Sequence, residues 1–164
     1  MKHCQFRDKL KEFYISTCMD RSIFALIEGG KVIHFERYKF DWDTHMTIEG
    51  LNKIVFMSVC CSSFVAVDVN GVFFFHNTDC VDYDSDGECL DTASTTTKID
   101  VSKYITPRKP FRNSFFFSGD CLFIIDVNGD VWKFDKGSAF DDEIPFSNKP
   151  IKGPGLSNIV HISG

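Results

Sequence analysis

The sequence predicts an all-β fold assembled from repeated hairpins, and three observations predict it. Two stretches, FVAVDVNGVFFF (residues 64–75) and LFIIDVNGDVWKF (residues 122–134), carry the same centre, Asp-Val-Asn-Gly, between two apolar runs. Phe, which favours strands, occurs 18 times, whereas Trp and Tyr occur only 2 and 4 times. No segment sustains the 3.6-residue periodicity of an amphipathic helix. A β-hairpin is therefore the expected building unit of the chain.

Each copy of the Asp-Val-Asn-Gly phrase predicts two antiparallel strands and a tight turn. Asn-Gly between apolar runs is typical of a two-residue type I′ turn, because both residues tolerate a positive φ angle. The expected strand pairs are 64–69 with 72–75 and 122–127 with 131–134. Both faces of these strands are apolar, which indicates that other sheets cover them on both sides. Asp68 and Asp126 hold the same place before the two turns, which favours a role in capping backbone N–H groups.

A third, more divergent copy lies upstream, in IFALIEGGKVIHF (residues 23–35), where two glycines replace Asn-Gly. A further strand is expected before each hairpin, and each ends in a short break of Ser, Cys or Gly. These strands are FYISTC (13–18), IVFMSVCC (54–61) and SFFFSG (114–119). The phrase GLNKIVFMSV (50–59) returns as GLSNIVHISG (155–164). The last residues are therefore expected to open a fourth unit.

The spacing of the units predicts a β-propeller or a related array. The turn glycines Gly30, Gly71 and Gly129 lie 41 and 58 residues apart, which suits several short strands per unit. The expected division is a lead-in at 1–12 and a single domain at 13–164, with units of about 13–53, 54–113 and 114–158, a fourth unit starting at 159–164, and a polar insertion at 76–112. Residues 6–13 are expected to form a helix or a frayed lead-in. A compact β-sandwich or barrel made from the same hairpins is the alternative.

The repeated unit resembles the regulator of chromosome condensation repeats. Those repeats read roughly Ile-x-x-Ile-x-Cys/Ala-Gly, then Ser-Leu-Ala-Leu, then Asp-Gly-x-Val-Tyr-x-Trp-Gly. The matching positions are Ile159, Ile162, Gly164, Ala66, Asn70, Gly71, Phe73, Ile124, Asn128, Gly129, Val131 and Trp132, with the link PIKGPGL at 150–156. The similarity covers about residues 13–164 outside the insertion. His76 and Asp135 stand where the family has a glycine after the second hairpin strand.

This resemblance implies a β-propeller whose units each form a four-stranded blade, with about three blades in this chain. Because the family's propellers close with seven blades, a three-blade arc is expected to leave two apolar blade faces that invite self-association. For function, the resemblance implies a non-catalytic module for protein–protein interaction. The alternative is a regulator that promotes guanine-nucleotide exchange on a small GTPase.

Composition and charge set the remaining expectations. A formal net charge of −5 argues against a nucleic-acid surface, and the basic stretch TPRKPFR (106–112) is too short for a nucleic-acid channel. The apolar runs are shorter than a signal peptide or a membrane-spanning helix requires. The 7 Cys residues form an odd number, which favours free thiols in a reducing compartment. An intracellular protein, cytoplasmic or nuclear, without membrane attachment is therefore expected.

One acidic stretch has a partial calcium-binding pattern. DYDSDGECLD (82–91) places Asp at alternate positions before a Gly, as calcium loops do, but Ala93 stands where an EF-hand loop needs Glu. A solvated acidic loop tip is the simpler interpretation, so no metal-binding residue is assigned.

The remaining candidates for chemistry are also weak. His76, Cys80 and Cys89 lie in one insertion and suit Zn²⁺, but they lack the paired spacing of zinc sites. Cys60 and Cys61 are expected to point to opposite faces of one strand. The 5 His residues are scattered, and no Gly-x-Ser-x-Gly nucleophile motif is present. The chain is therefore expected not to be an enzyme, with no catalytic residue and no cofactor.

Overall fold

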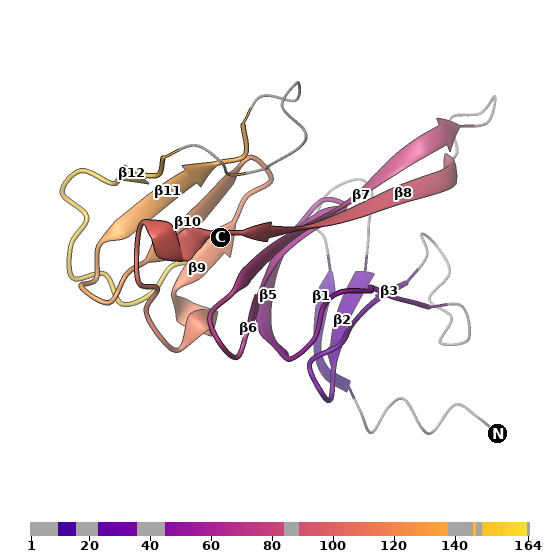
Figure 1. Cartoon of the computed structure of the whole chain (residues 1–164), viewed down its shortest axis with the longest axis horizontal. Coiled ribbons are helices and arrows are strands. Elements are labelled where there is room, and N and C mark those ends of the chain that lie inside the picture. The colour runs from indigo at the N-terminus through magenta and orange to yellow at the C-terminus, as the bar shows by residue number, and fades with distance from the viewer. Residues whose placement is uncertain are drawn as a thin grey trace.

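The computed structural model describes residues 10–15, 23–35, 45–83, 89–137, 146 and 149–163, and it is all-β, as predicted. Three four-stranded antiparallel sheets follow one another along the chain (Figure 1). Sheet 1 contains β1 (Leu10–Ile15), β2 (Ile23–Ile27), β3 (Val32–Phe35) and β4 (Met46–Thr47). Sheet 2 contains β5 (Ile54–Cys60), β6 (Ser63–Asp68), β7 (Phe73–Tyr83) and β8 (Cys89–Ile99). Sheet 3 contains β9 (Phe115–Phe117), β10 (Cys121–Ile125), β11 (Val131–Asp135) and β12 (Ile151–Lys152).

Each sheet is a simple meander, because strands that are consecutive in sequence are also neighbours in space. The predicted hairpins are confirmed: β6 pairs with β7 from Val67 opposite Phe73, and β10 pairs with β11 from Ile125 opposite Val131. The more divergent copy also forms a hairpin, of β2 and β3. The repeated phrases of the sequence are thus the central hairpins of three similar sheets.

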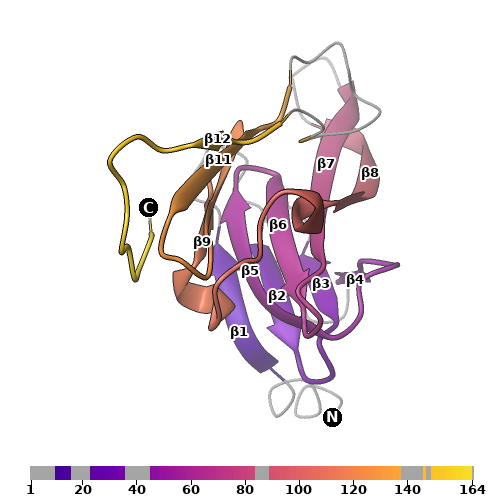
Figure 2. The same ribbon diagram turned by 60° about the vertical axis from the view of Figure 1, so that its left-hand side comes forward.

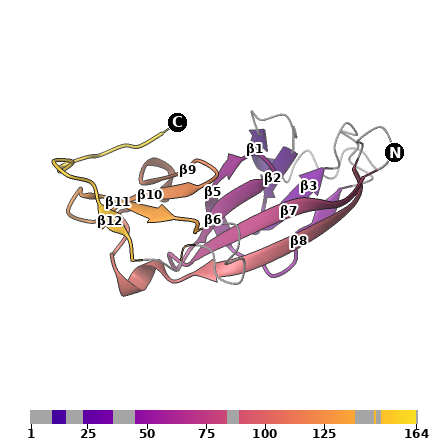
Figure 3. The same cartoon turned by 90° about the horizontal axis from the view of Figure 1, so that it is seen from above.

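Sheet 2 lies between sheets 1 and 3, and two apolar layers hold the three together (Figures 1 and 3). The layer between sheets 1 and 2 contains Phe24, Leu26, Val32, Ile48, Leu51, Ile54, Met57, Phe64 and Ala66. The layer between sheets 2 and 3 includes Val65, Val67, Phe73, Phe75, Phe115, Phe117, Leu122, Ile124 and Phe134. Aromatic rings meet edge to face in both layers, and the ring centroids of Phe24 and Phe64 lie 5.0 Å apart. Phe side chains thus make much of the packing between the sheets.

The turns of the two best-matched hairpins differ from the prediction. Gly71 has a φ of 85°, but Asn70 is not among the residues with positive φ. The Asp68 N–H donates to the Val72 carbonyl at 3.0 Å, and the Gly71 N–H donates to the Asp68 carbonyl at 3.1 Å. Three residues therefore separate the paired ends, in a type I turn followed by a left-handed glycine. The same contacts recur around Gly129, so the prediction of two-residue type I′ turns is wrong for both hairpins.

The aspartate before each turn explains this geometry. Asp68 Oδ1 accepts hydrogen bonds of 2.8 and 2.9 Å from two backbone N–H groups of its own turn. Asp126 Oδ1 does the same with the N–H groups of Asn128 and Asp130, and its Oδ2 accepts a 3.0 Å bond from Trp132 Nε1. Burial of the Asp126 carboxyl opposes ionisation, but these hydrogen bonds outweigh it and lower the pKa of Asp126. The predicted capping role of both aspartates is confirmed.

The expected polar insertion at 76–112 is largely a strand hairpin and not a loop. β7 and β8 continue far past the rest of sheet 2 and form a long arm (Figure 1). The Thr residues of β8 suit a pleated strand, because β-branched side chains favour that conformation. Beyond the arm, Ile99, Val101, Ile105 and Phe111 are buried in the layer between sheets 2 and 3. The segment therefore belongs to the core at its C-terminal end.

The start of the chain also differs from the prediction. β1 begins at Leu10, so the helix expected over residues 6–13 is wrong for residues 10–13, and residues 1–9 lie outside the description. The helical segments among the described residues are two short 3₁₀ turns, η1 (Val101–Lys103) and η2 (Phe111–Asn113). None of the described helices is long and apolar enough to cross a membrane.

A close backbone contact marks the junction between sheets 1 and 2. Lys53, just before β5, has a φ of 56° and packs directly on Gly30 of the preceding hairpin. The Ile54 N–H donates to the Gly30 carbonyl at 2.9 Å. A Cβ atom at Gly30 would lie 2.5 Å from this backbone, so only glycine fits.

The C-terminal segment repeats this junction. Asn158 has a φ of 58° and packs on Gly129, and the Ile159 N–H donates to the Gly129 carbonyl at 2.9 Å. A Cβ atom at Gly129 would lie 2.9 Å from the Asn158 Cα. Residues 159–163 then run beside sheet 3 without pairing as a strand (Figure 2). The two copies of the repeated phrase, at 50–59 and 155–164, thus form the same kind of junction. The described residues of the second copy form no strand of a fourth sheet.

Candidate functional site

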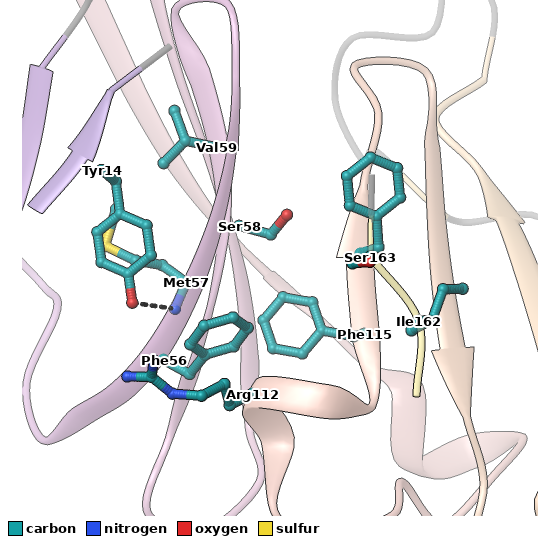
Figure 4. Close-up of a pocket in the computed structure, with 10 residues that line it drawn as sticks. Tyr14, Phe56, Met57, Ser58, Val59, Arg112, Phe115, Ile162 and Ser163 are labelled. Atoms are coloured by element: carbon teal, nitrogen blue, oxygen red, sulfur yellow. Dashed lines mark hydrogen bonds between the residues drawn. The ribbon is translucent and has the colours of Figure 1, made fainter. Parts of the chain in front are cut away.

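The first strands of the three sheets line one groove, which we call the inner groove (Figure 4). β1, β5 and β9 each stand at the end of their sheet's strand order, so one edge of each lacks a neighbouring strand within its sheet. The groove has a volume of about 330 Å³. Its lining residues are Tyr14, Phe56, Met57, Ser58, Val59, Arg112, Phe115, Phe116, Ile162 and Ser163. Residues from 14 to 163 therefore meet at this single concave surface.

A tyrosine ties sheets 1 and 2 together at the groove. The Tyr14 hydroxyl accepts a hydrogen bond of 3.4 Å from the Met57 N–H (Figure 4) and donates to the Glu12 carboxylate. Burial raises the pKa of Tyr14 to about 12, although the bond from the Met57 backbone acts in the opposite direction. The phenol therefore stays protonated and serves as a neutral hydrogen-bonding group.

A serine makes the corresponding link between sheets 2 and 3. The Ser58 hydroxyl accepts a hydrogen bond of 3.0 Å from the Phe117 N–H. Beside it, the rings of Phe56 and Phe115 meet edge to face with centroids 5.1 Å apart. These contacts fix β9 against β5, so the groove is held by the same packing that stacks the sheets.

Arg112 supplies the cation of the groove. Its guanidinium lies 5.7 Å from the centroid of the Phe56 ring and forms an ion pair with Glu12. The Arg112 side chain is 62% exposed, so it remains accessible from solution despite this pairing. An arginine on an aromatic face, next to open strand edges, can hold an extended peptide by stacking and hydrogen bonding.

The histidine of the sequence-predicted zinc candidates is a packing residue. His76 is buried, stacks on Phe64 at 4.8 Å, and has Thr96 Oγ1 and Thr78 Oγ1 within 2.9 and 3.1 Å of its two ring nitrogens. Burial first, and then the charge of His34, lower the pKa of His76 to about 4. The ring is therefore neutral near pH 7, and both nitrogens are engaged with threonines.

The other metal candidates fall outside the description. Residues 84–88 and the side chains of Cys80 and Cys89 are not described, so the calcium interpretation of 82–91 and the zinc interpretation of His76, Cys80 and Cys89 stay untested. Within the residues that are described, no group of three or more His, Cys, Asp or Glu side chains could hold a metal ion.

The arrangement of the adjacent cysteines differs from the prediction. β5 ends at Cys60, and Cys61 lies in the following turn with a φ of 54°. The two sulfur atoms are 3.8 Å apart, so the expectation of opposite faces is wrong. The strand alternation that separates neighbouring side chains stops where the strand stops.

Sequence reasoning did not bring the residues of the inner groove together. Arg112 stood out only as part of the basic stretch 106–112 and Ile162 only as a repeat match, and no motif links them to Tyr14 or Phe116. They meet because three strands and the η2 turn converge. One signal could have found two of them: Tyr14 and Phe116 lie in the strands that precede the three hairpins. Aligning those strands as the inner edge of a stack of sheets would have brought them together.

No family model, curated protein or solved structure matches this chain. The resemblance to regulator of chromosome condensation repeats therefore stays a prediction, and the function proposed below rests on the geometry of the inner groove.

Proposed function

We propose that the chain is a non-catalytic module of propeller-like blades that binds another protein through the inner groove. One observation carries this proposal: Tyr14, Phe56, Arg112 and Phe116 converge on the groove from three sheets and the η2 turn. Aromatic residues and Arg are enriched at the centres of protein–protein interfaces and at their energetic hot spots. The stacking of three similar meanders supports the blade interpretation, because propeller blades pack face to face in this way.

The groove suits an extended segment of a partner protein. The inner edges of β1, β5 and β9 lack a neighbouring strand of their own sheets, and a peptide backbone can hydrogen-bond to such edges. The rings of Phe56 and Phe116 offer contact to an apolar side chain, and the Arg112 guanidinium offers donors to a carbonyl or carboxylate.

Peptide selection tests this proposal. Displayed peptides of about 12 residues, selected on the whole chain, are expected to bind Arg112→Ala at least tenfold more weakly, since hot-spot arginines contribute on the order of 2 kcal/mol. Lys103→Ala is the matched control, because Lys103 is an exposed cation paired with Asp100 away from the groove, and its affinity should stay within about twofold. Equal binding of the selected peptides to wild type and Arg112→Ala would contradict the proposal.

The alternative is guanine-nucleotide exchange on a small GTPase, which rests on the repeat resemblance alone. Release of a fluorescent guanine nucleotide from a panel of small GTPases tests it. Under the proposal above, the chain leaves every release rate unchanged. Acceleration of one GTPase by tenfold or more would favour the alternative.

A further inference from the structure

Cys60 and Cys61 are consecutive residues, and a tight turn brings their sulfur atoms together. The two Sγ atoms lie 3.8 Å apart, close enough for one thiol to donate a weak hydrogen bond to the other. β5 ends at Cys60, which pairs with Ser63 of β6, so Cys61 and Ser62 form the turn between the strands. Both cysteines are half-buried thiols, so a small solute can reach them from solution.

The corresponding turn of sheet 3 has glycine where this turn has cysteine. There the chain turns through Gly119 and Asp120, and the Ser118 N–H donates to the Cys121 carbonyl at 2.9 Å. Gly119 has a φ of 72° and Cys61 a φ of 54°, so both residues hold the left-handed position of their turn. A residue with a Cβ atom is strained in that conformation, whereas glycine is not. The fold therefore favours glycine at this position, and a strained residue in its place points to a use of the side chain.

The other thiol among the described side chains has a different environment. Cys121 donates a hydrogen bond of 3.3 Å to the Asp135 carboxylate. Burial first, and then this hydrogen bond, raise the pKa of Cys121. The thiolate is the reactive form of cysteine, so a raised pKa makes this thiol less reactive. Cys121 therefore provides an internal comparison for the pair.

We infer that Cys60 and Cys61 form a redox-active dithiol, which hydrogen peroxide converts to a disulfide between the two consecutive residues. Peroxide oxidises one thiol to a sulfenic acid and is itself reduced, with one molecule of water released. The second thiol then displaces the hydroxyl of the sulfenic acid, which leaves as a second molecule of water. In total the two thiols lose two hydrogen atoms, and one peroxide gives two waters.

The geometry makes this disulfide easy to reduce. The peptide bond between the two cysteines is trans. A trans peptide holds adjacent Cα atoms about 3.8 Å apart, whereas disulfides usually join Cα atoms about 4.4–6.8 Å apart. Departure from the preferred geometry stores strain and makes the bond more reducible. The site is therefore expected to oxidise reversibly and to be reset by a thiol such as glutathione.

The neighbouring turn favours an internal disulfide over a bulky adduct. Cys60 Sγ lies 3.5 Å from the point that a Cβ atom at Gly119 would occupy, so the turns of sheets 2 and 3 meet at this sulfur. A disulfide to Cys61 adds no atoms there. A glutathione molecule attached to Cys60 would have to displace the packed turn.

Peroxide treatment of the whole chain, followed by alkylation and mass spectrometry, tests the inference. Chymotrypsin cleaves after Phe and releases residues 57–64, which contain Cys60 and Cys61 and no other cysteine. After treatment, this peptide should have lost two hydrogen atoms and should resist alkylation, and excess reduced glutathione should restore both thiols. The pair should also react about tenfold faster than Cys121, or more.

Cys61→Gly is the matched variant, because it introduces the residue of the corresponding turn. Its melting temperature should be no lower than that of wild type, since glycine relieves the left-handed strain. Cys60 then lacks its adjacent thiol, and peroxide should carry it on to a sulfinic acid that glutathione does not reverse. Cys121→Ser, the control, should form the disulfide as wild type does.

Three results would overturn the inference. The first is a pair that remains open to alkylation at peroxide doses that oxidise Cys121. The second is a disulfide that joins Cys60 or Cys61 to a different cysteine. The third is a melting temperature of Cys61→Gly below that of wild type, which would show that packing explains the cysteine. Neither thiol of the pair lines the inner groove, so the inference does not rest on the proposed function.

Discussion

β6 and β10 occupy the same place in their sheets and carry the same phrase, yet they have different neighbours. Every residue of β6, Ser63–Asp68, is buried, because sheet 1 covers one of its faces and sheet 3 the other. In β10, Leu122 and Ile124 are buried against sheet 2, while Phe123 between them is half-buried on the face of sheet 3 turned away from sheet 2. Both strands are apolar on both faces, but β6 has a sheet packed on each face and β10 has a sheet packed on one face.

The largest expected effect compares one Phe from each strand. Phe64→Ala removes a fully buried ring from the layer between sheets 1 and 2 and should lower the free energy of unfolding by about 3–5 kcal/mol. Phe123→Ala removes a half-buried ring and should lower it by about 1–2 kcal/mol. Urea unfolding followed by circular dichroism measures both. Equal losses would mean that Phe123 is packed as tightly as Phe64.

The next largest effect is a pH dependence of the free energy of unfolding, and it arises from a histidine of sheet 2. His76 stacks on Phe64, its partner across the hairpin, whereas Phe134 takes the corresponding position in sheet 3, opposite Leu122. Because the pKa of His76 is about 4 in the folded state, against 6.5 for the free side chain, the unfolded chain binds the proton first. Stability should therefore fall as the pH drops below 6.5, and this contribution should level off below about 4, with a total of up to about 3 kcal/mol.

His76→Gln provides the matched comparison for that prediction. Carboxylates titrate in part of the same range, so the difference between wild type and variant isolates the histidine. The slope of unfolding free energy against pH between 6.5 and 5 should be smaller in the variant. Identical slopes in the two proteins would show that His76 takes up its proton as easily in the folded chain as in the unfolded one.

The smallest effect compares the two turn aspartates. Both aspartates accept two backbone bonds and one side-chain bond, but Asp126 accepts the latter from Trp132 Nε1 at 3.0 Å, whereas Asp68 accepts a longer one, of 3.3 Å, from Asn70 Nδ2. Asp126→Ala should therefore lower the free energy of unfolding by about 2 kcal/mol and Asp68→Ala by about 1 kcal/mol. Trp132 fluorescence should respond to the first substitution and not to the second. A larger loss from Asp68→Ala would reverse this ranking of the two turns.

The hairpins could be predicted from the sequence because each is local: two apolar runs flank a turn that needs glycine. The exact turn could not, since the carboxylates of Asp68 and Asp126 reach the backbone and favour a three-residue loop. The arm of β7 and β8 was interpreted as a loop because its strands are polar and pair with each other away from the core. The inner groove could not be predicted either, since it joins Tyr14 to Ser163 through the packing of whole sheets.

The junctions at Gly30 and Gly129 bear on how such a chain can lengthen during evolution. In both, a left-handed residue rests on the glycine of the preceding hairpin, so the step from one sheet to the next is set by a backbone contact of the unit itself. A duplicated gene segment that carries both the glycine and its left-handed partner also carries the geometry of attachment. New units can then be added without redesigning the old ones, and their side chains are free to diverge once the copy is in place.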